Sequence, residues 1–241
     1  MPAAYGYRAR IGYTCPVFLA EIFPYDFYRM VPDGVSLLLA TMSVWEGTPE
    51  EMRLSAQQSM RAAAEMAKSG ADIVVFGGVP VSFAAGYDSV EDLVRMMEGE
   101  CGVPVTASLL CQNEGLKAVG AKNVVVLRSG AGSNDRHMEE VERLGCTVLA
   151  VRGIGRSMRG GAALTADETL EMARELLREH PDADTLHCPS PHWPMAANIE
   201  TLEQEFGINV VTSGQAITWH ALRRCGINDS IQGYGRLMRE C

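Results

Sequence analysis

The segment GADIVVFGG (residues 70–78) sets a short run of β-branched and aromatic side chains between an aspartate and two glycines. Such a run, bounded by turn residues, predicts a short strand. The segment DADTLHCPS (182–190) has the same layout, with Asp184 in the place of Asp72 and Ser190 in the place of Gly78. A helix, a second strand and another helix follow each segment, so we interpret the chain as a diverged duplication.

Short β-rich runs alternate with longer helical stretches along the whole chain. Strands are predicted over 10–13, 36–40, 73–76, 103–106, 124–127, 147–151, 185–188 and 209–211, and helices over 48–68, 89–100, 113–119, 134–144, 166–179, 199–206 and 216–224. This alternation predicts an α/β fold of two pseudo-symmetric lobes, each a parallel sheet flanked by helices, with the active site in the cleft between them. The first lobe is expected to hold residues 1–117 and 214–241, and the second 118–213.

The composition argues against several classes of function. The formal charge of -9 is spread along the chain and no Lys/Arg-rich run occurs, so neither nucleic acid nor an anionic membrane surface is an expected partner. The sequence has no long apolar span and no signal-peptide layout, so we expect a cytoplasmic protein. The 7 scattered cysteines include no CxxC pair, which argues against disulfides and zinc. A small molecule is the expected partner, and the oligomeric state is left open, a homo-oligomer included.

The segment HCPSPHWP (187–194) follows the strand of the second half. Cys188, Ser190 and His192 are spaced by two, so an extended backbone would point all three in the same direction. A thiol, a hydroxyl and an imidazole on one face are suited to nucleophilic or proton-transfer chemistry. In the structural alternative, the cysteine is a small buried apolar residue and the prolines only end the strand. A metal site that uses His187 is disfavoured, because no further cluster supplies the remaining ligands.

Residues expected to bind a ligand lie where the other strands end. The segment SGAGSND (129–135) is a candidate anion cradle with Ser133 and Asn134 as helix caps, although an ordinary capped loop explains it equally well. The loops over 17–34 and 79–90 are expected to shape the pocket. No dinucleotide-binding or phosphate-loop glycine pattern occurs, so we expect no nucleotide cofactor. The predicted substrate-binding residues are Cys15, Pro16, Gly78, Val79, Ser129, Gly130, Thr212 and Ser213.

Five segments resemble the aspartate/glutamate racemase superfamily, and within it the branch of arylmalonate decarboxylase and maleate isomerase. They are IGYTCP (11–16), GADIVVFGGVPVSF (70–83), GLKAVGAKNVVVL (115–127), the stretch from PDAD to GINVVTSGQAITWHALR (181–223) and the closing GYGRL (233–237). The resemblance extends over nearly the whole chain and implies two pseudo-symmetric α/β lobes, no cofactor, and a carbon acid as substrate.

The resemblance also implies roles for single positions. Racemases and maleate isomerases of this superfamily use one cysteine from each lobe, whereas arylmalonate decarboxylase keeps only the second, which protonates an enediolate. In this chain the first position falls on Gly78, which favours the arrangement with one proton donor. Gapless matching places Ser190 at the second position, and a shift of two residues would place Cys188 there. A Thr-Ser pair of the decarboxylase is replaced by Val79-Pro80, and a tyrosine by Gly130.

These observations lead to one principal expectation and three alternatives. We expect a cofactor-independent enzyme that acts at the carbon next to a carboxylate of a small organic acid, as a decarboxylase (lyase) with protonation from Cys188 or Ser190. The first alternative is an isomerase or racemase of a small dicarboxylate or amino acid, with Cys15 on the opposite side. The others are a hydrolase that depends on Ser190 and His192, and a carboxylate-binding protein without catalysis.

Overall fold

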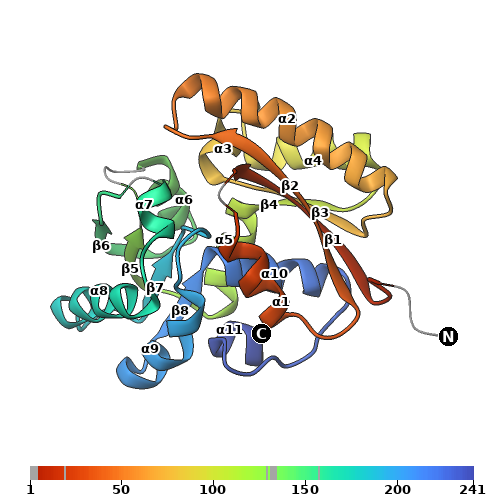
Figure 1. Ribbon diagram of the computed structural model, residues 1–241. Coiled ribbons are helices and arrows are strands. Elements are labelled where there is room, and N and C mark those ends of the chain that lie inside the picture. The colour runs from red at the N-terminus through yellow and green to blue at the C-terminus, as the bar shows by residue number, and fades with distance from the viewer. Residues whose placement is uncertain (1–4, 19, 129, 131–134, 157) are drawn as a thin grey trace. The chain divides into compact units, whose positions relative to one another are not determined.

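The computed structural model describes residues 5–18, 20–128, 130, 135–156 and 158–241 (Figure 1). Their contacts divide the chain into two compact units. Unit 1 falls within Met1–Ala20, Val31–Cys111 and His220–Asn228, and unit 2 within Glu21–Met30, Gln112–Trp219 and Asp229–Cys241. No helix of the described ranges combines the length and the apolar character needed to cross a membrane.

Unit 1 is built on a parallel sheet of four strands in the order β2-β1-β3-β4. The apolar run predicted at its centre forms β3, which is buried along its whole length. Helix α2 packs on β1, β2 and β3, and α4 packs on β4. The elements are β1 (Ala9–Val17), β2 (Val35–Val44), α2 (Pro49–Lys68), β3 (Ile73–Phe76), α3 (Val79–Phe83), α4 (Val90–Cys101) and β4 (Val105–Ala107).

Unit 2 repeats this topology, with a parallel sheet in the order β6-β5-β7-β8. Its central strand β7 is again buried throughout. The elements are α1 (Ile22–Met30), β5 (Asn123–Arg128), α6 (Asp135–Arg143), β6 (Thr147–Gly153), α7 (Met158–Ala162), α8 (Ala166–Glu179), β7 (Thr185–Cys188), a 3-10 turn (Ala196–Asn198), α9 (Ile199–Phe206), β8 (Asn209–Thr212) and α11 (Gly235–Glu240). Helices α5 (Ser108–Ala118) and α10 (Ser213–Arg224) each contribute residues to both units.

The two aspartates that anchor the sequence repeat hold equivalent positions. The Asp72 carboxylate accepts the amide N–H of Arg10 at 2.7 Å, and that of Asp184 accepts the amide of Asn123 at 2.9 Å. Each bond ties the start of a central strand to the start of its neighbour. The match in local bonding supports the interpretation of the halves as a duplication.

A second pair of carboxylates repeats in the same way. Glu98 accepts the amide of Val105 and Glu203 accepts the amide of Val210, both at 3.1 Å. Each glutamate lies in the last turn of a helix that ends on a left-handed glycine, Gly102 or Gly207.

The structure corrects the predicted loops at 17–34 and 79–90. These ranges contain α1 and α3. Pro24 and Pro80 both lie in the first turn of their helices, where the missing N–H would have no partner inside the helix. Helices α5 and α10 also begin earlier than predicted, directly after β4 and β8.

Candidate functional site

Cys188 is the last residue of β7 and is completely buried. Its register partner is Thr212, the last residue of β8, so the segments that leave these two strands start side by side. Burial raises the pKa of the Cys188 thiol well above its usual value. The thiol is therefore neutral near pH 7 and lies within the sheet.

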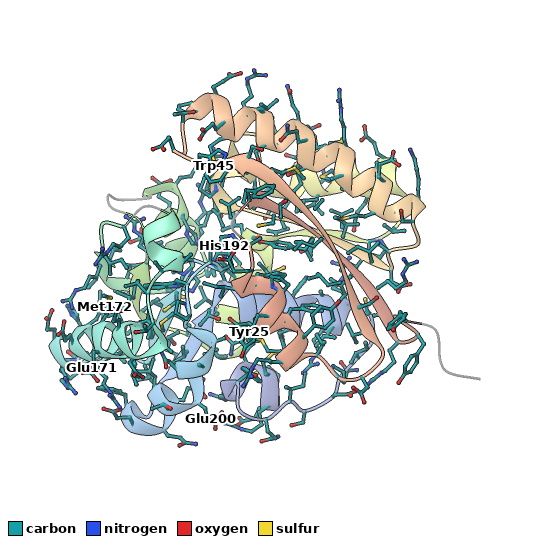
Figure 2. The ribbon with its side chains drawn as sticks, in the orientation of Figure 1. Tyr25, Trp45, Glu171, Met172, His192 and Glu200 are labelled. Atoms are coloured by element: carbon teal, nitrogen blue, oxygen red, sulfur yellow. The ribbon has the colours of Figure 1, made fainter. Side chains whose placement is uncertain are left out.

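Ser190 and His192 lie beyond the end of the strand, and both are partly exposed; Figure 2 labels His192. The chain turns at Pro191–His192. The expectation that Cys188, Ser190 and His192 share one face assumed an extended backbone through all three residues. The strand, however, ends at Cys188. Burial lowers the pKa of His192 to about 4, so its imidazole is neutral near pH 7.

The first turn of α10 starts beside this segment and is closed by a reciprocal cap. The amide of Gln215 donates to the Thr212 hydroxyl at 3.3 Å, and the amide of Thr212 donates to the Gln215 side-chain oxygen at 3.0 Å. The amides of Ser213 and Gly214 lie within the same turn, where helix geometry supplies no acceptor. These two N–H groups are suited to an anionic ligand such as a carboxylate.

Unit 2 also contains a buried pair of histidines, one on α6 and one on β7, which was not predicted from the sequence. The rings of His137 on α6 and His187 on β7 are 5.6 Å apart between centroids, in an edge-to-face arrangement. The Nδ1 atom of His187 is 3.0 Å from the carbonyl oxygen of Val211. Within the part of the chain that the structure describes, no group of three or more His, Cys, Asp or Glu side chains could hold a metal ion.

In unit 1, the predicted residues Cys15 and Pro16 lie near the end of β1. The Cys15 thiol is buried and donates to the carbonyl oxygen of Val17 at 3.3 Å. Burial raises its pKa to about 12. Pro16, which has no amide N–H, lies where the register between β1 and β2 shifts. Cys15 is thus a neutral thiol with a local acceptor, which is unfavourable for a base.

Gly78 follows β3 and adopts a left-handed conformation with φ of 83°. Its amide donates to the hydroxyl of Ser108, the first residue of α5, at 3.3 Å. A Cβ atom added at Gly78 would lie 2.7 Å from Cγ of Pro16, closer than side chains approach one another. Position 78 therefore has no room for a thiol side chain without a shift of Pro16. Val79 is buried and begins α3.

The remaining predicted residues divide into described and undescribed positions. Ser129 and the capping candidates Ser133 and Asn134 lie outside the described residues, as does most of the proposed anion cradle. Gly130 is described and exposed. Thr212 and Ser213 are both buried at the junction of β8 and α10, where Thr212 forms the helix cap.

A family model described as arylmalonate decarboxylase matches residues 20–238. The chain belongs to the arylmalonate decarboxylase family. Its sequence is 25% identical over 228 residues to arylmalonate decarboxylase of Bordetella bronchiseptica, covering 92% of this chain and 93% of that protein. The predicted resemblance to this branch of the superfamily is confirmed.

Solved structures confirm the two-lobed α/β fold of the arylmalonate decarboxylase family. A liganded mutant of arylmalonate decarboxylase, with one glycine changed to cysteine and one cysteine changed to serine, superposes with a TM-score of 0.85 at 23% identity, covering 97% of this chain and 100% of that one. The maleate isomerase Iso from Pseudomonas putida S16 gives 0.82 at 18% identity, covering 96% and 98%. The maleate cis-trans isomerase of Nocardia farcinica gives 0.81 at 22%, also covering 96% and 98%.

Proposed function

We propose that this protein is a cofactor-independent decarboxylase of a small malonate-type acid, and that Ser190 is its proton donor. Membership of the arylmalonate decarboxylase family supports the reaction class. The observation that carries the proposal is the parallel register of Cys188 with Thr212, since it sets the segment with Ser190 beside the first turn of α10. A hydroxyl, an imidazole and two helical amides thus lie on the two segments that follow the carboxyl ends of β7 and β8.

In the proposed reaction these residues stabilise an anionic intermediate and donate a proton. The bond between the α-carbon and one carboxylate breaks, CO2 leaves, and the electron pair stays on the α-carbon, delocalised into the remaining carboxylate as an enediolate. The amides of Ser213 and Gly214 are suited to stabilise the oxygens of that anion, because they are fixed donors at the positive end of a helix. The Ser190 hydroxyl gives its proton to the carbon and is reprotonated from water.

Exposure favours Ser190 over Cys188 as the donor. Ser190 is partly exposed, whereas Cys188 is completely buried in β7. Ser190 also occupies the place of Gly78 in the internal repeat, since each lies two residues beyond the end of its strand. The steric restriction at Gly78 supports a mechanism with a single donor and so favours decarboxylation over isomerisation by two thiols.

The test is incubation of the protein in deuterated water with malonate, methylmalonate, phenylmalonate and maleate. We expect CO2 release from at least one malonate, with one deuterium at the α-carbon of the product, and loss of both signals in Ser190→Ala. Conversion of maleate to fumarate without CO2 would establish the isomerase instead. Thermal stabilisation by all four acids with no product would indicate a binding protein. Turnover of carboxylic esters alone would indicate a Ser190-dependent hydrolase.

A further inference from the structure

Gln215, in the first turn of α10, has a completely buried side chain whose amide is bonded at both ends. Its Oε1 atom accepts the backbone amide of Thr212 at 3.0 Å, and its Nε2 atom donates to the carbonyl oxygen of Tyr234 at 2.7 Å. A buried side-chain amide is costly unless its polar atoms find partners, and these two bonds supply one for each atom. The side chain therefore links the start of α10 to the segment that precedes α11.

The bonds of Gln215 enclose the two amides proposed to bind the carboxylate. Ser213 and Gly214 lie between Thr212 and Gln215, whose reciprocal bonds close the turn on both sides of them. A Cβ atom added at Gly214 would lie 3.8 Å from Cδ2 of Phe23 on α1, so the turn is also packed against this helix of unit 2. With Gln215 in place, the turn has little freedom to rotate.

The carbonyl oxygen of Tyr234, which accepts the side-chain bond, belongs to a segment that α9 holds in place. The amide of Gly235 donates to Glu200 at 3.0 Å, and the amide of Arg236 donates to Glu203 at 2.7 Å. Both glutamates lie on α9. These bonds fix the backbone within two residues of the carbonyl, so the closing segment GYGRL (233–237) provides a rigid anchor for α10.

We propose that Gln215 is a positioning residue of the anion-binding turn, and that it holds the amides of Ser213 and Gly214 in place by tying the turn to the closing segment. The inference rests on the proposed function and extends it to a residue that contacts no reacting atom. Donors that are already fixed need no reorganisation when negative charge develops on the substrate, so they stabilise an anion better than donors on a mobile turn. Loss of the Gln215 side chain should therefore weaken anion binding.

The affinity for malonate measures this effect without turnover. Calorimetric titrations are made in the Ser190→Ala background, which lacks the proposed proton donor, with and without Gln215→Ala. We expect Gln215→Ala to raise the Kd for malonate about five- to tenfold, because hydrogen bonds to a charged group are weakened. Gln232→Ala is the matched control, since Gln232 is an exposed glutamine near the closing segment that bonds the Ser230 hydroxyl. An unchanged Kd in Gln215→Ala would refute the positioning role.

Gln215→Glu tests the bond to Tyr234 through its pH dependence. A protonated glutamic acid has the shape of glutamine, with one oxygen to accept the Thr212 amide and a hydroxyl to donate to the Tyr234 carbonyl. Ionisation removes that donor and places a negative charge beside the bound anion. Burial favours the neutral form, so the Kd of this variant, relative to the same background without it, should recover from about pH 8 to about pH 6.

The recovery separates positioning from a purely structural role. Gln215→Ala should show no recovery of Kd at the lower pH. A purely structural role of Gln215 would change the melting temperature of Gln215→Glu with pH and leave its Kd for malonate unaffected. A relative Kd that stays the same from pH 8 to pH 6 in Gln215→Glu would contradict the role of the bond to Tyr234.

Backbone NMR reports on the two amides directly. Malonate should shift the amide proton resonances of Ser213 and Gly214, because they form hydrogen bonds to a carboxylate, and Gln215→Ala should reduce these shifts. Val141→Ala controls for a general loss of stability, since Val141 is a buried residue of α6. It should lower the melting temperature and leave the shifts unchanged. The absence of shifts at both amides with malonate, methylmalonate and maleate would refute the anion site and the role of Gln215 with it.

The outcomes distinguish this inference from the proposed function. Malonate binding that depends on Gln215, in a protein that releases no CO2 from any malonate, would support the positioning role and contradict the decarboxylase. CO2 release at a rate that Gln215→Ala leaves unchanged would support the decarboxylase and refute the positioning role.

Discussion

The imidazole rings of His137 and His187 meet edge to face in the interior of unit 2, with 5.6 Å between their centroids. Burial is the main cause that lowers both pKa values, to about 3 for His137 and about 4 for His187. The neighbouring His187 and the Arg128 guanidinium lower the pKa of His137 further. Both imidazoles are thus neutral in the folded protein at physiological pH.

Unit 2 should therefore lose stability in mild acid. The unfolded chain binds protons on histidine from about pH 6.5, while folded His187 binds them only near pH 4. The stability contributed by the neutral histidines is fully present above the pKa of histidine in the unfolded chain. It is lost as the pH falls below that pKa, and the loss from His187 alone reaches about 3 kcal/mol at pH 4. Urea unfolding at pH 8, 6 and 4.5 measures this slope. His187→Phe should flatten it, and a slope unchanged in that variant would contradict the assignment.

Substitution of Ser190 should mainly reduce activity, whereas substitution of Cys188 should mainly reduce stability. Ser190→Ala is expected to lower kcat about 100-fold or more, because a positioned proton donor is lost. Ser190→Cys should retain activity, since a thiol at that position can also donate a proton. Cys188→Ala should lower the melting temperature because it leaves a cavity beside Thr212, with kcat changed less than about threefold. A larger kcat effect at Cys188 than at Ser190 would reverse the proposed roles.

The anion-binding role of the first turn of α10 can be tested without removal of the helix. Ser213→Pro deletes one amide N–H at the first helical position, where proline is well tolerated. We expect KM to rise about tenfold, because a hydrogen bond to a charged group is lost. Ser213→Ala keeps the amide and serves as the matched control. Equal KM values in the two variants would show that the amide does not contact substrate.

The paired glutamates of the repeat should differ in their contribution to stability. Glu203 accepts two amides, from Val210 at 3.1 Å and Arg236 at 2.7 Å, and burial raises its pKa. Glu98 accepts one amide, from Val105, and otherwise pairs with the exposed Arg224 at 3.4 Å. Glu203→Ala is expected to lower the free energy of unfolding by about 2 kcal/mol, and Glu98→Ala by about half of that. Urea unfolding of both variants at pH 7 provides the check, and equal losses would contradict this ranking.

The sequence was sufficient for the sheets because their central strands carry a simple signal. The runs at 73–76 and 185–188 coincide with β3 and β7, and the predicted order of strands and helices holds around them. Helices α1 and α3 were not predicted from the sequence, and both carry a proline, Pro24 or Pro80, in the first turn, which accepts it.

The candidate site was less accessible to sequence reasoning, because exposure and loop geometry decide it. Residues 188, 190 and 192 alternate in the sequence, yet the strand ends at Cys188 and only the later residues are partly exposed. The ends of β1 and β2 were predicted too early, at residues 13 and 40, whereas these strands continue to Val17 and Val44.

Strand β4 passes directly into α5, and β8 passes directly into α10. These two junctions limit which mutations the fold can accept during evolution. No linker residue separates strand from helix at Ala107–Ser108 or at Thr212–Ser213. One residue inserted or deleted there would rotate the following helix by about 100° about its own axis. Such a rotation would turn buried side chains toward water, so substitutions at these junctions are compatible with the fold while changes of length are not. Alignments of relatives should therefore run without gaps through both points.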